Sequence, residues 1–318
     1  QTFNNPEAAI PLLQATLDCY PYSINHWNSL GKCYLSTNDY EEAHEAIDFA
    51  LAIDDSNAEA LTLKAFCYQQ SGELQKSCDY YLRLAEQQEN KTRAYLALAK
   101  TYFEMQDYTS SIYYIEALLD NKDALSKYEL SELYGDIALC HAALKHIGVG
   151  QASIRRSLEL NENDPDTLIV AGRFFLMEAK ACNDETAKAE NQAKGELYFR
   201  QALNLIMEDE RLDYLFTIGA ACFDTQNFKL AAQYYEQINR EFPDNAPATY
   251  FFLAYCYFYL EEAISCMHYI AKMKHELPDA YSNLGTSDSI LSDTRFNELM
   301  RNLKDSVNNG KVDLDNFL

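Results

Sequence analysis

The sequence is poor in positive charge and has no long apolar run. Its 318 residues include 26 Lys and Arg against 49 Asp and Glu, which gives a formal net charge of −23 at pH 7. This balance argues against a nucleic-acid partner, because such proteins need a basic surface, and against flat binding to an anionic membrane. No apolar segment approaches the ~20 residues that span a bilayer, so we expect no membrane insertion.

The usual signatures of catalytic and metal sites are also missing. The sequence contains no CxxC, HExxH, GxSxG, P-loop or GxGxxG pattern. His44-Glu45 begins like a zinc-protease motif, but Asp48 stands where the second histidine is needed. Carboxylates are so abundant that no pair of them stands out. We therefore expect no enzyme, no cofactor and no metal site.

Disulfide spacing is absent although there are nine cysteines, an odd number spread from Cys19 to Cys266. This usage favours free buried thiols in a reducing compartment, so we predict a cytoplasmic protein. The first residue is Gln1 rather than Met, which indicates that a signal peptide, a tag or an upstream segment has been removed. A periplasmic or secreted location therefore stays open as the alternative.

A 34-residue period is the main positive signal. Hydrophobic residues make up 48% and aromatics 13%, so the chain can bury a large core. Stepping by 34 keeps residue types in five columns: Trp27, Leu61, Tyr95; Gly31, Ala65, Ala99; Tyr34, Tyr68, Tyr102; Ala43, Ser77, Ser111; and Ile47, Tyr81, Ile115. A sixth column, Leu30 and Leu98, is broken by Lys64.

The spacing within one period predicts two helices. Trp27, Leu30, Gly31 and Tyr34 lie at i, i+3, i+4 and i+7, on one helical face. A polar turn at 36–39 separates them from a second helix over 43–50. One such pair cannot bury its apolar face alone, whereas stacked pairs bury it against each other.

This pattern resembles the tetratricopeptide repeat. The resemblance implies an all-α fold, a right-handed α-solenoid superhelix of about seven helix-turn-helix repeats with a C-terminal capping helix. We divide the chain into a partial repeat with only its second helix (1–22), three in-phase repeats (24–125), four further repeats (131–275), and a degenerate repeat, capping helix and tail (278–318). An insertion near 178–193 predicts a lengthened helix pair with a solvated tip or, alternatively, a projecting contact arm.

The resemblance also implies that the first helices line a concave groove. Two sets of side chains then fall at groove positions: Asn28, Lys32, Phe66, Arg93, Lys100 and Phe103, which include three cations for acidic groups, and the aromatic Phe216, Phe223, Phe251, Tyr255 and Phe258. Two alternatives stay open: the cations are scattered and solvated, or the helices of 279–308 fold over the apolar run at 250–260 and make it core.

These observations predict a non-catalytic protein–protein interaction scaffold that binds a peptide or partner segment in the concave groove. The alternatives are a structural subunit that uses its convex face, and an enzyme with an acid/base pair in the groove. Neither the identity of the partner nor the oligomeric state follows from the sequence.

Overall fold

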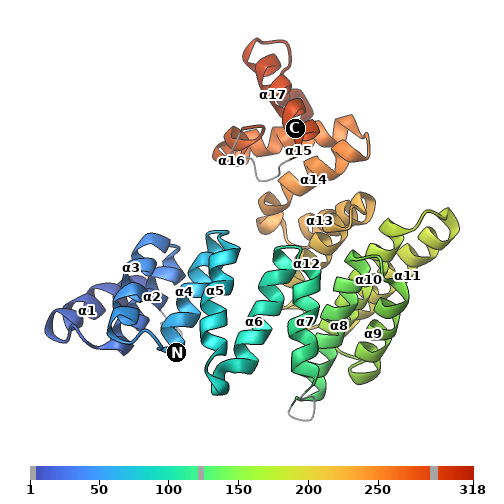
Figure 1. Cartoon of the computed structure of the whole chain (residues 1–318). Helices are drawn as coiled ribbons and strands as arrows, with labels where there is room; N and C mark the ends of the chain where they lie inside the picture. Colours follow the sequence, from blue (N-terminus) through green and yellow to red (C-terminus); the bar gives the residue numbers. More distant parts are fainter. Residues whose placement is uncertain (1–4, 121–124, 287–292) are drawn as a thin grey trace. The chain divides into compact units, whose positions relative to one another are not determined.

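The computed structural model describes residues 5–120, 125–286 and 293–318, and over these residues it contains helices and no β-strand. Seventeen α-helices follow one another in this part of the chain (Figure 1). The expected all-α repeat fold is thus confirmed. Parts of the expected segments at 1–22, 24–125 and 278–318 lie outside the described residues, namely 1–4, 121–124 and 287–292.

The chain divides into two compact units, residues 1–153 and 154–318, which we describe separately. The N-terminal unit contains α1 (Pro6–Cys19), α2 (Ile24–Thr37), α3 (Tyr40–Ile53), α4 (Ala58–Gln70), α5 (Leu74–Ala85), α6 (Lys91–Glu104), α7 (Tyr108–Leu119) and α8 (Lys127–Ala143). Helix α9 (Ile147–Leu160) contains the boundary between the units. Helices α2 and α3, α4 and α5, and α6 and α7 pack as hairpins, and α1 packs on α2.

The same turn ends the first helix of each hairpin. One residue in the left-handed region closes it, with φ near +60° at five non-glycine positions and +77° at Gly72: Asn38, Gly72, Gln106, Lys145, Gln226 and Glu261. The next backbone N–H donates back to a carbonyl five residues earlier, as from Asp39 to Tyr34 (2.9 Å), Glu73 to Tyr68 (2.8 Å) and Asp107 to Tyr102 (2.9 Å). These bonds satisfy carbonyls that the helix end leaves open, so each turn reverses the chain without loose polar groups.

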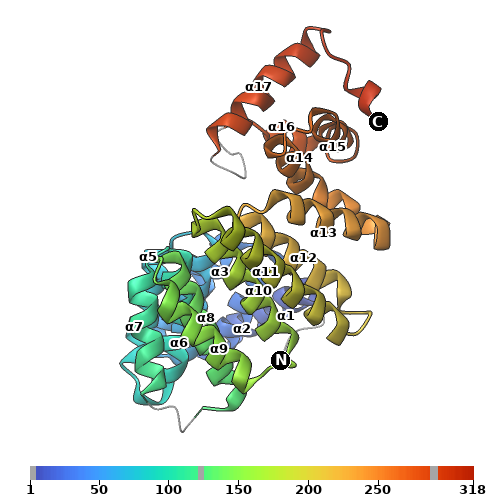
Figure 2. The ribbon, with the colours of Figure 1, turned by 90° about the vertical axis from the view of Figure 1, so that its right-hand side faces the viewer.

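The C-terminal unit repeats the hairpins with longer helices at its start. It contains α10 (Pro165–Ala181), α11 (Glu185–Leu205), α12 (Arg211–Asp224), α13 (Phe228–Glu241), α14 (Tyr250–Tyr259), α15 (Ala263–Glu276), α16 (Pro278–Asn283) and α17 (Thr294–Asn308). Residues 178–193 continue α10 and begin α11, so the insertion lengthens this hairpin. Both views show α17 beside the group formed by α14, α15 and α16 (Figures 1 and 2).

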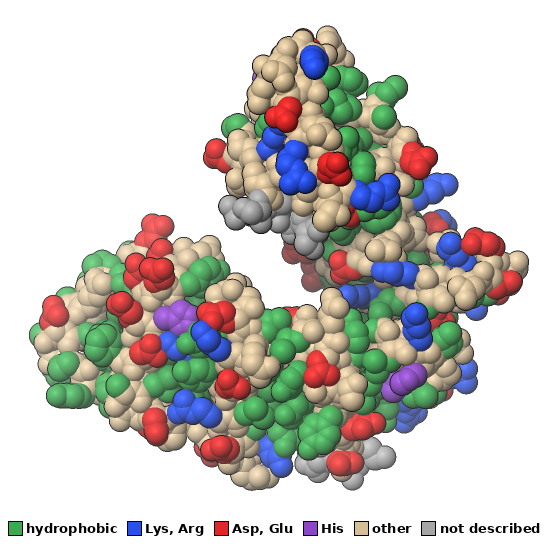
Figure 3. Space-filling model, turned by 45° about the horizontal axis from the view of Figure 1, so that its top comes forward, with side chains coloured by type: hydrophobic (Ala, Val, Ile, Leu, Met, Phe, Trp, Pro, Cys, Tyr) green, Lys and Arg blue, Asp and Glu red, His purple; other side chains and the backbone are tan. Residues whose placement is uncertain are grey.

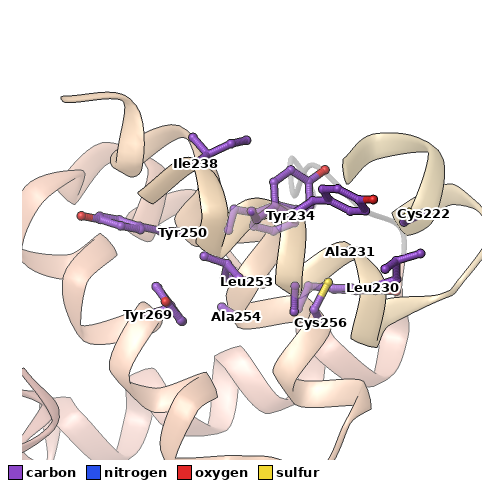
Figure 4. Close-up of a cluster of buried hydrophobic side chains, with 14 of the residues drawn as sticks. Cys222, Leu230, Ala231, Tyr234, Ile238, Tyr250, Leu253, Ala254, Cys256 and Tyr269 are labelled. Carbon is purple, nitrogen blue, oxygen red and sulfur yellow. The ribbon is translucent and has the colours of Figure 1, made fainter. Parts of the chain in front are cut away.

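One apolar core joins the helices of this unit. Side chains of α12, α13, α14 and α15 meet in it, as Figure 4 shows for Cys222, Tyr234, Leu253 and Tyr269. Phe296, Met300 and Leu303 add α17 to the same core and are each at most 8% exposed. Helix α17 is therefore an integral part of the unit, because burying an aromatic or Leu side chain is worth about 1.5–3 kcal/mol each.

Candidate functional site

The first helices of the N-terminal unit present two columns of side chains with a spacing of 34 residues. One column holds Asn25, Glu59 and Arg93, and the other holds Lys32, Phe66 and Lys100, on α2, α4 and α6 in turn. Because the repeats are in phase, each column places its members at equivalent points of successive helices. We call these six residues the N-terminal columns.

Asn28 does not face a groove, which corrects the sequence-based expectation. Its side chain is only 1% exposed, and its Nδ2 donates to Asn57 Oδ1 (3.1 Å) and to Glu59 Oε2 (3.0 Å). The Asn57 carbonyl oxygen also caps the start of α4 by accepting from the Ala60 N–H (2.9 Å). Asn28 therefore fixes α2 against the beginning of α4 rather than offering an amide to a partner.

Lys32 forms an ion pair with Glu59, a residue that the search for groove cations passed over. The hydrogen bond from Lys32 lowers the pKa of the Glu59 carboxyl below its ordinary value; burial opposes this shift, and Asn28 and the nearby Arg93 add to it. Glu59 lies 34 residues after Asn25 and 34 before Arg93, so its place in a column was readable from the sequence. The pair leaves Lys32 less available to a partner than predicted.

Arg93 and Lys100 stay exposed and form no ion pair with any described residue. Phe66, on the neighbouring helix α4, is 41% exposed. Phe103 is half-buried, and its ring meets the edge of Tyr108 at 5.4 Å between centroids. The part of the predicted site that faces solvent is thus two unpaired cations with one exposed aromatic ring.

The aromatic residues predicted in the C-terminal unit are covered by α17. Phe251 is 6% and Tyr255 8% exposed, and Phe296 of α17 lies 6.2 and 5.1 Å from their ring centroids. Phe258 also meets Phe296, at 5.4 Å. The expectation of an open aromatic pocket at Phe251 and Tyr255 is therefore corrected: these rings belong to the core, as the second alternative had it.

Polar contacts hold α17 in place at both of its ends. Asp293, the N-cap of α17, accepts hydrogen bonds from the hydroxyls of Tyr255 (2.8 Å) and Tyr259 and from the Phe296 N–H (2.9 Å). Lys304 donates to the carbonyls of Ser282 (2.7 Å) and Leu284 (2.6 Å). These bonds satisfy polar groups that burial under α17 would otherwise strip of water.

Phe216 and Phe223 are half-buried among other rings of the same unit. Phe216 lies 6.4 Å from Tyr235, and Phe223 lies 5.3 Å from Phe252 and 5.1 Å from Tyr255. Their main contacts are therefore with the core of the unit.

Neither the chemistry nor the surface indicates catalysis. Among the described residues no group of three or more His, Cys, Asp or Glu is placed to hold a metal ion. In that same part of the chain no helix has the length and apolar character that crossing a membrane requires. Figure 3 shows acidic side chains spread among apolar ones over the visible face of the N-terminal unit, without one dominant cluster.

Residues 28–92 match the family model described as tetratricopeptide repeat. The chain carries tetratricopeptide repeats. The matched segment holds α3, α4 and α5 entire, and with them two of the three in-phase repeats. A comparison with curated proteins finds no relative.

Several solved structures are similar to the repeats of this chain. PilF of Pseudomonas aeruginosa is 18% identical and covers 69% of this chain and 92% of its own, with a TM-score of 0.46. PilW, described as a widely conserved type IV pilus biogenesis factor, is 17% identical over 69% of this chain and 94% of its own, with a TM-score of 0.48. YrrB, described as a tetratricopeptide-repeat protein with an unusual peptide-binding site, is 14% identical over 64% and 96%, with a TM-score of 0.43.

Proposed function

We propose that the protein is a non-catalytic interaction scaffold whose N-terminal columns bind an acidic peptide segment of a partner protein. Arg93 and Lys100 take the acidic groups, and Phe66 takes an apolar side chain beside them. The observation that carries this proposal is the exposure of two unpaired cations and one large aromatic ring on neighbouring first helices, in a chain of net charge −23. Exposed charges of this kind speed and orient association, and a desolvated aromatic supplies most of the affinity.

Lys32 plays a secondary part in this arrangement. A partner carboxylate would have to compete with Glu59 for its ammonium group. An exposed ion pair is worth only about 0–1 kcal/mol, so the exchange costs little and also gains little. We therefore place the acidic subsite at Arg93 and Lys100.

The test is selection from a library of phage-displayed random twelve-residue peptides against the full chain. We expect the selected peptides to carry Asp or Glu near a large apolar residue. The double variant Arg93→Glu/Lys100→Glu should lose them, because it replaces two cations with two anions. Raising the salt concentration should weaken binding to the wild type, because it screens exposed charges.

Lys127→Glu is the matched control. Lys127 is exposed on α8 and has no ion pair among the described residues, and it belongs to neither column. This variant should retain the selected peptides. Equal loss in Lys127→Glu and in the double variant, or selection of peptides without acidic residues, contradicts the proposal. Loss of binding only on mutation of second-helix residues would favour the structural subunit that uses its other face.

A cytoplasmic location remains part of the same proposal. It rests on the nine cysteines, none of which forms a disulfide in the structure. Labelling the thiols of the native protein as it is isolated, before any reductant is added, would test it. Nine reactive thiols after denaturation are expected, and a native disulfide would speak for the periplasmic or secreted alternative.

A further inference from the structure

A pocket of about 550 Å³ lies between second helices of the C-terminal unit, on helices other than those of the proposed peptide site. Its walls are α11 and α13, with Arg211 contributed by α12. The lining residues are Glu196, Arg200, Leu203, Asn204, Arg211, Leu230, Gln233, Tyr234, Gln237 and Arg240. The volume falls within the range of about 300–1,000 Å³ that is usual for ligand sites.

The lining concentrates arginine in a strongly acidic protein. Three of the ten arginines of the chain, Arg200, Arg211 and Arg240, line this pocket against one glutamate, Glu196. A guanidinium group presents several N–H donors in one plane and matches a carboxylate in a bidentate way. The pocket is therefore locally cationic and suited to planar anions.

At least one of these arginines is open to a ligand. Arg240 is exposed and forms no ion pair with a described residue. Arg200 pairs with Glu196 one helical turn away while its side chain is 68% exposed, and such i,i+4 pairs are worth only about 0.3–0.5 kcal/mol. Arg211 is held by Glu241, with 2.7 Å between Nε and Oε2. A ligand carboxylate thus meets Arg240 directly and exchanges with Glu196 at Arg200.

The other lining groups favour a peptide over a simple anion. Asn204 and Gln233 each carry an amide donor and an amide acceptor, which a peptide backbone needs in pairs and a phosphate ion does not. The Tyr234 hydroxyl has no hydrogen-bond partner among the described residues, although the side chain is 6% exposed. Leu203 and Leu230 supply apolar surface for a side chain between two acidic ones.

We propose that this pocket binds a short acidic peptide segment, with its carboxylates on Arg240 and Arg200 and an apolar side chain against Leu203 and Leu230. The site lies on second helices, so the scaffold would engage acidic segments on both helix layers. It stands independently of the proposal for the N-terminal columns, because no residue is shared.

The test measures fluorescence anisotropy of a labelled eight-residue peptide of alternating Glu and Leu. It uses the full chain carrying Arg93→Glu/Lys100→Glu, so that the N-terminal columns are silent. In this background the peptide should still bind, and a peptide with Lys in place of Glu should not. Adding Arg240→Glu should weaken binding about tenfold or more, since a hydrogen bond to a charged group is worth about 1.5–3 kcal/mol.

Arg301→Glu, on α17 and outside the pocket, is the matched control with the same change in charge. It should change the affinity less than about twofold, in line with screening of distant exposed charges. The Lys peptide should bind the Arg240→Glu variant more tightly than it binds the parent. Unchanged melting temperatures would show that the exposed substitutions leave the fold intact.

Three results overturn the proposal. The first is no binding of the Glu–Leu peptide in the silent background, and the second is equal weakening by Arg240→Glu and Arg301→Glu. The third is displacement by inorganic phosphate together with equal affinity for an octamer of Glu alone, which would define a simple oxyanion site and remove the peptide as ligand.

Discussion

Phe66 and Tyr255 occupy the same place in two repeats and have opposite environments. Each lies five residues after the bulky residue that begins its first-helix pattern, Leu61 or Tyr250. Phe66 is 41% exposed, whereas Tyr255 is 8% exposed beneath Phe296. The repeat pattern decides toward which side such a residue points, but a segment some forty residues further along decides whether that side meets solvent. The N-terminal unit keeps its first-helix columns open, and the C-terminal unit closes the equivalent surface with α17.

The sharpest way to break this comparison is to weaken the cover. Phe296→Ala should lower the free energy of unfolding of the C-terminal unit by about 3–5 kcal/mol, because it removes a buried ring that contacts Phe251, Tyr255 and Phe258. Urea denaturation followed by tyrosine fluorescence measures this loss. A cost below ~1 kcal/mol would mean that α17 is not packed as described.

A second test compares the close approach of helices in the two units. Gly31 and Gly172 occupy equivalent positions of their repeats, and a Cβ on Gly172 would lie 2.4 Å from Cε1 of the fully buried Phe199. A rigid ring in a packed core cannot yield easily, so Gly172→Ala should destabilise the protein by about 1–3 kcal/mol.

Gly31→Ala is the matched variant in the N-terminal unit. Its new Cβ would lie 2.8 Å from Cγ1 of Ile47, a more adjustable side chain, and in-phase repeats carry Ala65 and Ala99 at this place. The gain in helix propensity of about 1 kcal/mol should offset most of the strain. Thermal denaturation of both variants checks the order, and an equal loss in the two would contradict it.

How far the sequence predicted these features depends on whether they repeat. The helix pairs and the small residue at Gly31 recur at 34 residues, so periodicity revealed them. Lys64 shows the limit, because it stands in an apolar column and is 3% exposed. It pairs with Asp48 (2.6 Å) and donates to the His44 carbonyl (3.3 Å), contacts that no single column displays.

The candidate site was only partly predictable for the same reason. Columns identified Arg93, Lys100 and Phe66 as solvent-facing, but the pairing of Lys32 with Glu59 depends on two columns meeting across α2 and α4. The burial of Phe251 and Tyr255 depends on α17, which belongs to no repeat. Non-periodic, long-range packing therefore decided which of the predicted side chains are accessible.

A third test uses pH to loosen the anchor of α17. Burial raises the pKa of the Asp293 carboxyl, but hydrogen bonds from the Phe296 N–H and from the hydroxyls of Tyr259 and Tyr255 lower it, and the net pKa lies below its ordinary value. The stability that this depressed pKa contributes is therefore fully present above the ordinary pKa of an unfolded Asp and is lost as the pH falls through the lower folded value.

Asp293→Asn keeps a side chain that caps helices well but removes the charge. It should cost about 1 kcal/mol at pH 7, the usual worth of a lost charge-assisted hydrogen bond. Urea titrations at decreasing pH should show the wild type and the variant converging as the carboxyl becomes protonated. A gap that stays constant at acid pH would show that the carboxylate does not anchor α17.

The smallest effect on stability is expected on the open side of the comparison. Phe66→Ala removes a ring that is 41% exposed, so the free energy of unfolding should change by no more than ~0.5 kcal/mol. The same change should nevertheless weaken binding of selected acidic peptides by about 1–3 kcal/mol, because a partner would desolvate this ring. Denaturation and anisotropy measurements on one preparation separate the two quantities. A large loss of stability would place Phe66 in the core with Tyr255, and unchanged binding would remove it from the N-terminal site.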